Sequence, residues 1–124
     1  MPSEAETAFR EAIKGLLYMS ETDAPFKLVR WEKSIPQMTP TALLALSKND
    51  PRARVEEQTL DEFFTDLVRD ESESAEQYKC LLTTLQKHLT NLRVYRIGQV
   101  EIGVYILGEA EGDWQGVKTK AVET

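Results

Sequence analysis

Three oxygen-bearing groups end the sequence: the carboxylate of Glu123, the hydroxyl of Thr124 and the α-carboxylate that follows it. Residues 114–122 before them are expected to form a strand, which would hold these groups at one rigid tip. Hard divalent cations such as Mg²⁺ prefer oxygen ligands of this kind. In the alternative interpretation the sheet simply ends where the chain ends, and the tip binds nothing.

A second oxygen-rich segment lies nearer the N-terminus, where Ser20, Glu21, Thr22 and Asp23 precede a proline. Its polar composition predicts a loop over residues 20–25. Side chains of these types often bond the backbone of their own turn, so a purely local role is one interpretation. The other is that the two carboxylates contact a partner.

Few residues suggest catalysis. The sequence has one histidine, His88, and one cysteine, Cys80, so it offers no ligand set for a zinc site and no pair for an intrachain disulfide. It also lacks a G-x-S-x-G nucleophile motif and a glycine-rich phosphate loop. We therefore predict a protein that is not an enzyme and holds no cofactor of its own. Cys80 precedes two leucines on a predicted helix and is expected to be buried or half-buried.

Length and composition indicate a single domain over residues 1–124. The longest apolar runs have four or five residues, too few to span a membrane, and residues 1–6 do not resemble a secretion signal. A lone cysteine fits a reducing compartment, so we expect a cytoplasmic protein. The net charge of −6 argues against direct binding to nucleic acid and suits a basic protein partner, although it also serves solubility.

Helices are predicted from hydrophobic periodicity and from capping residues. They cover about residues 4–17, a short segment that begins at Thr39 and Pro40, a second short segment after Thr59, and residues 75–89. The capping pairs are Ser3 with Glu6, Thr59 with Glu62, and Ser74 with Gln77. The last helix has the clearest apolar face, formed by Tyr78, Leu81, Leu82, Leu85 and Leu89.

Strands are predicted over residues 26–32, 52–57, 94–97, 100–107 and 114–122. Gly98 and Gln99 indicate a tight two-residue hairpin, and residues 110–113 a turn. Apolar residues occupy both faces of the 100–107 strand, including Val100, so both faces of the sheet should be at least partly covered. We therefore predict an α/β fold, a three-layer α/β/α sandwich around a central, largely antiparallel sheet.

Residues 15–26 with Trp31 and Glu32, residues 94–109 and residues 116–124 together resemble the nuclease A inhibitor family. Members of this family inhibit a sugar-non-specific, Mg²⁺-dependent nuclease. The resemblance implies the same three-layer fold and a one-to-one complex with a non-specific endonuclease. The resemblance is weaker in the middle of the chain. There, residues 66–74 form a shorter segment than the corresponding one in the family, and they contain no aromatic residue.

The resemblance also assigns roles to the two oxygen-rich segments. Glu21 matches a glutamate that contacts a basic residue in the nuclease cleft, and Thr124 matches a threonine that reaches the catalytic Mg²⁺ of the nuclease. The other expected partner-binding residues are Glu123, Asp23, Ser20 and Thr22. Any metal bound through Thr124 would belong to the nuclease.

Two other functions remain open. The chain could be a regulatory interaction module with the same fold, a different partner and no nuclease inhibition. It could also be a small enzyme of unknown chemistry. A nuclease assay separates the first alternative from inhibition, and the second requires a pocket of convergent polar groups.

Overall fold

The computed structural model describes residues 4–19, 23–32, 39–47, 49, 52–69, 73–110 and 113–122. In chain order the elements of this part are α1 (Glu4–Ile13), β1 (Leu17–Met19), β2 (Asp23–Pro25), β3 (Lys27–Glu32), α2 (Pro40–Leu46), β4 (Val55–Gln58), α3 (Leu60–Arg69), α4 (Glu73–His88), β5 (Thr90–Ile97), β6 (Glu101–Ala110) and β7 (Asp113–Val122). Five strands form a sheet in the order β3-β7-β6-β5-β4, with every neighbouring pair antiparallel. Strands β1 and β2 form a separate antiparallel sheet.

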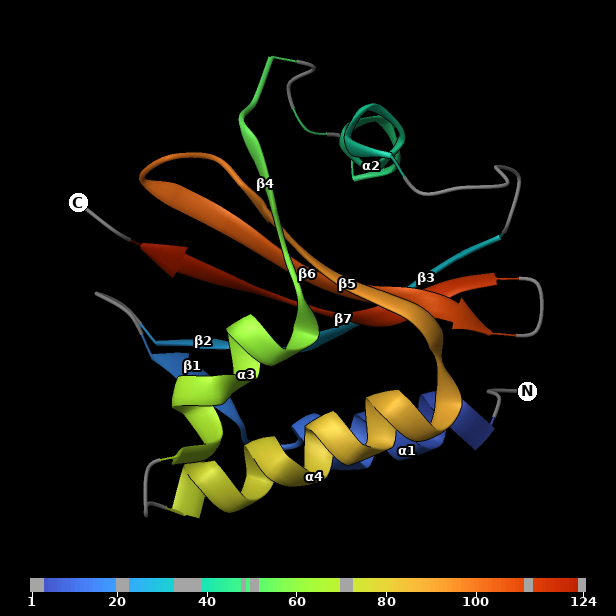
Figure 1. Cartoon of the computed structure of the whole chain (residues 1–124), viewed down its shortest axis with the longest axis vertical. Coiled ribbons are helices and arrows are strands. Elements are labelled where there is room, and N and C mark those ends of the chain that lie inside the picture. The colour runs from blue at the N-terminus through green and yellow to red at the C-terminus, as the bar shows by residue number, and fades with distance from the viewer. Residues whose placement is uncertain are drawn as a thin grey trace.

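The main sheet has an apolar core on each face. On the first face, Val104 and Ile106 of β6 belong to a cluster that includes residues of α1, α3 and α4. On the second face, Tyr105 and Leu107 of the same strand pack in a cluster with Leu43 of α2. Figure 1 shows the three helices on one side of the sheet and α2 on the other. The prediction that both faces are at least partly covered is therefore confirmed.

The α/β class and the antiparallel central sheet are also confirmed. A complete third layer is not established, because α2 has only seven residues and is the one helix that the described part of the chain places on the second face. The sheet beyond α2, toward the C-terminal end of β7, carries hollows on this face.

The long helix α4 is confirmed and supplies the centre of the first-face core. Leu81 and Leu85 are 0% exposed, whereas Leu82 is only partly buried. His88 lies at the edge of this core, with its ring edge-on to that of Phe9. The expectation for Cys80 is wrong: its side chain is exposed, because a residue next to Leu81 lies about 100° around the helix from it.

Two predicted helix starts are confirmed. The Thr39 hydroxyl accepts a hydrogen bond from the backbone nitrogen of Ala42 at 3.1 Å, and Pro40 occupies the first turn of α2. The Thr59 hydroxyl accepts one from the backbone nitrogen of Glu62 at 3.1 Å. Each hydroxyl satisfies a backbone donor that the first helical turn leaves unpaired.

The predicted capping pair of Ser74 with Gln77 is wrong. The predicted pair of Ser3 with Glu6 is not tested, because Ser3 lies outside the described residues. Helix α4 already begins at Glu73, so Ser74 lies inside it. The Gln77 amide instead donates to the carbonyls of Ala12 and Lys14, at 3.1 and 2.9 Å. Gln77 therefore supplies donors to the C-terminal end of α1, where helical carbonyls lack partners.

The N-terminal region differs from the prediction at two points. Helix α1 ends at Ile13 rather than at residue 17, and Gly15 has a φ of 75°, a backbone conformation that favours glycine. The segment predicted as a loop over residues 20–25 includes strand β2. The small sheet was missed because three-residue strands are too short to show a periodic pattern.

The connection between β5 and β6 is longer than the predicted two-residue turn. Ile97 pairs with Gly103, and Glu101 already pairs with β7. Gly98 has a φ of 112°, so glycine is required there as predicted, although in a wider turn. Val100 in this turn is 51% exposed, contrary to the expectation that it faces the core. No helix among the described residues is long and apolar enough to cross a membrane.

Replacing Leu85 with alanine should lower the free energy of unfolding by about 2–5 kcal/mol, because the side chain is fully buried between α4 and the sheet. Leu82→Ala, on the same helix but only partly buried, should cost less. Chemical denaturation of the two variants measures the difference. Equal losses, or an unchanged midpoint for Leu85→Ala, would show that the buried face of α4 is wrongly assigned.

Candidate functional site

The structure describes the strands that flank the predicted partner-binding residues in sequence: β1, β2 and β7, here called the frame. Ser20, Glu21, Thr22, Glu123 and Thr124 lie outside the described residues, so their roles stay predictions. The backbone of Asp23 is described, as the first residue of β2. Strands β1 and β2 flank the first predicted segment, and β7 leads to the second.

Strands β1 and β2 fix both ends of the first segment. Met19 pairs with Asp23, and the register continues through Tyr18 with Ala24. Residues 20–22 therefore connect two paired positions of an antiparallel ladder. This pairing fixes the backbone positions of Met19 and Asp23, between which the predicted segment lies in the sequence.

Strand β1 is held by aromatic side chains from α3 and α4. The Tyr78 hydroxyl donates to the carbonyl of Leu17 at 2.9 Å. The Tyr18 ring stacks on Phe63 at a centroid distance of 5.6 Å and meets Phe26 edge-on. Burial raises the pKa of the Tyr78 phenol well above its ordinary value, so the hydroxyl keeps its proton and remains a donor.

Strand β2 is held against β7 by one buried hydroxyl. Thr119 shares its hydrogen between the carbonyls of Ala24, at 3.3 Å, and Pro25, at 3.2 Å. The ladder between β3 and β7 ends at the pair Lys27 and Lys118, and the preceding residues pair with β1 instead. Pro25 pairs with Leu17 of β1, and it has no backbone N–H to donate to β7.

The frame thus places the facing ends of β1 and β2 at the same end of the molecule as the end of β7. Both β1 and β2 contact β7. Figure 1 shows the end of β1, the start of β2 and the end of β7 on the same side.

The shifted titratable groups serve the fold rather than a catalytic site. Arg30 bonds the carboxylates of Glu6, at 2.8 Å, and Asp113, at 2.7 Å, and these contacts raise its pKa. Asp113 begins β7, so this bridge lies at the other end of the strand from Val122. Burial raises the pKa of Tyr95 in the second-face core. The described residues contain no group of three or more His, Cys, Asp and Glu side chains that could hold a metal.

Sequence reasoning missed the two residues that position β1 and β2. Thr119 lies between Val117 and Ala121 on the inward side of its strand, and a hydroxyl at such a position needs a partner. Tyr78 lies on the apolar face of the long helix, where its hydroxyl also needs an acceptor. The signal in both cases was a polar atom on a predicted core face.

A model of the family described as nuclease A inhibitor-like protein, NuiA, matches residues 3–124. The chain belongs to the nuclease A inhibitor-like family. A comparison with curated proteins gives no match. The family match spans the described frame and both predicted segments, and the family name points to inhibition of a nuclease rather than to catalysis.

Thr119→Val should lower the free energy of unfolding by about 0.5–1.5 kcal/mol, because it removes the donor shared by Ala24 and Pro25. Backbone amides of β1 and β2 should exchange with solvent faster, while those at the centre of β6 should change less. Thr119→Ser keeps the hydroxyl and should largely restore protection of the small sheet. If Thr119→Val leaves that protection unchanged, the hydroxyl does not hold β2.

Proposed function

We propose that the protein is a cytoplasmic inhibitor of a Mg²⁺-dependent, sugar-non-specific nuclease. It acts as a one-to-one plug of the active site and is not turned over. The observation that carries this proposal is the family match over residues 3–124, which includes both oxygen-rich segments. The same family membership supports the three-layer sandwich as the complete fold.

The proposed chemistry imitates the substrate of the nuclease. The catalytic Mg²⁺ binds phosphate oxygens, and Thr124 offers an oxygen ligand in their place. Glu21 pairs with a basic residue that otherwise contacts the nucleic acid. Glu123 and Asp23 add negative charge at the rim, and Ser20 and Thr22 add hydrogen-bonding groups. The metal comes from the nuclease, so the inhibitor needs no cofactor.

The frame and the overall charge support this mechanism. Tyr78 and Thr119 fix β1 and β2, which limits the freedom of the chain at both ends of the Glu21 segment. A binding element that is ordered beforehand loses less entropy on association. The net charge of −6 favours encounter with a basic cleft.

One observation favours the alternative of an interaction module with another partner. Residues 66–74 are fewer than the resemblance implies for this segment and contain no aromatic residue. In the described part of the chain, helix α3 ends at Arg69 and α4 begins at Glu73. Aromatic residues commonly anchor interfaces, and their loss would alter the choice of partner.

Glu21→Ala should weaken inhibition, because truncating one member of a buried charge pair typically costs about 2–5 kcal/mol of affinity. Association should slow, and added salt should reduce the difference from the wild type. Glu76→Ala removes the same charge from the exposed side of α4 and serves as the control. Inhibition kinetics measure both effects. Equal affinity of Glu21→Ala and the wild type would remove this segment from the interface.

Extension beyond Thr124 by a peptide tag, or deletion of Glu123 and Thr124, should abolish inhibition. In the proposed complex Thr124 meets the metal, so additional residues collide with the floor of the nuclease site. The thermal midpoint should change little, because β7 pairs with its neighbours only as far as Val122 in the described part of the chain. A tag before Met1 is the control. Full inhibition by the C-terminally tagged protein would exclude the metal plug and favour the interaction module.

A further inference from the structure

A lysine-lined hollow lies where β2 leaves the edge of β7. It has a volume of about 310 Å³ and is lined by Ala24, Pro25, Lys27, Gly103, Tyr105, Lys118, Thr119 and Lys120. The hollow begins at the last pair of the β3–β7 ladder, Lys27 with Lys118. A second hollow of about 460 Å³ adjoins it, and the two share Ala24, Pro25, Gly103, Tyr105 and Lys120.

Three positive charges gather around the first hollow. Lys27 lies directly opposite Lys118, and Lys120 follows two residues later on the same face of β7. Like charges directly opposite in a sheet are destabilising. Among the residues that the structure describes, none of these three lysines forms an ion pair. The cluster is notable because acidic residues outnumber basic ones by 21 to 15 in the sequence.

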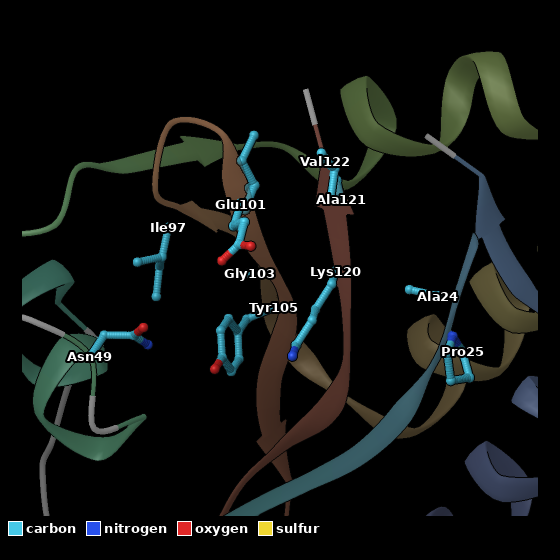
Figure 2. A pocket seen from close by; sticks show the side chains of 11 residues that line it. Ala24, Pro25, Asn49, Ile97, Glu101, Gly103, Tyr105, Lys120, Ala121 and Val122 are labelled. Carbon is cyan, nitrogen blue, oxygen red and sulfur yellow. The ribbon is translucent and has the colours of Figure 1, made fainter. Parts of the chain in front are cut away.

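The floor of the hollow is shaped by Gly103 and Tyr105. A Cβ atom on Gly103 would lie 3.3 Å from Cε1 of Tyr105. Glycine avoids this close contact with the ring and leaves the space in the hollow unfilled. Figure 2 shows the Lys120 side chain beside the Tyr105 ring, with Ala24 and Pro25 across from β7. Glu101, Asn49 and Ile97 border the adjoining hollow.

We propose that these hollows bind a small organic phosphate, a phosphomonoester carried as its dianion. The phosphate group would lie among Lys27, Lys118 and Lys120, because lysines bind phosphate as concentrated positive charges. The organic part would lie over Tyr105 and toward Ile97. The volumes are in the range of about 300–1,000 Å³ that is usual for small-molecule sites. This proposal is independent of nuclease inhibition.

The charge distribution favours a small ligand over nucleic acid. Binding along a nucleic acid backbone draws on many basic side chains and an overall positive surface. Here the described basic cluster is confined to three lysines around one concave surface of an acidic protein. A single compact dianion matches that arrangement.

The test uses the full chain, with phenyl phosphate as the probe at constant ionic strength. Saturable changes are expected in the NMR signals of the Lys27, Gly103, Lys118 and Lys120 amides. In the variant K27Q/K118Q/K120Q the dissociation constant for phenyl phosphate should rise at least about tenfold, a loss of about 1.4 kcal/mol or more. The matched control K14Q/K79Q/K87Q also removes three lysines, all outside the hollows, and should bind within about twofold of the wild type.

Phenyl phosphate should also raise the thermal midpoint of the wild type and of the control, but not that of the hollow variant. Amide spectra of the free proteins confirm that each variant is folded. The proposal is overturned if the wild type shows no saturable change, or if both triple variants lose binding equally. It is also overturned if an oligoglutamate peptide binds at the three lysines and phenyl phosphate does not.

Discussion

The end of the β3–β7 ladder at Lys27 and Lys118 shapes the region that surrounds both proposed sites. Pro25 has no N–H to donate to β7. It pairs with Leu17 of β1 instead, and Thr119 supplies the hydrogen-bond donor for the carbonyls of Ala24 and Pro25. One interruption in the pairing of β7 thus produces the small sheet on one side and the lysine-lined hollow on the other.

The small sheet matters because it is too short to be stable by itself. Its three paired positions need support from the main fold. Tyr78 gives that support from α4 and Thr119 gives it from β7, so the two strands that flank Glu21 in sequence are tied to the helical layer and the central sheet. The proposed inhibitory segment therefore depends on residues that do not themselves reach a partner.

The sequence predicted the elements with a long or well-marked pattern and missed those set by tertiary contacts. Helix α4 and the two faces of β6 followed from periodicity, and Thr39 and Thr59 followed from capping chemistry. The spacing of Ser74 and Gln77 matched a helix cap, but the Gln77 side chain instead donates hydrogen bonds to carbonyls at the end of α1. The hollow was not predictable because Lys27 is distant in sequence from Lys118, and only the register of β3 on β7 brings them together.

Strand β7 can serve two sites because its side chains alternate between the faces of the sheet. Val117, Thr119 and Ala121 point to the first face, where they form part of the core and hold β2. Lys118 and Lys120 point to the second face, beyond the cover of α2, and contribute charge rather than packing. Changes to the lysines therefore leave the first-face core intact, whereas a change at Thr119 acts on the frame of the Glu21 segment. The charge around the hollow and the packing of the first-face core therefore come from alternating residues of one strand.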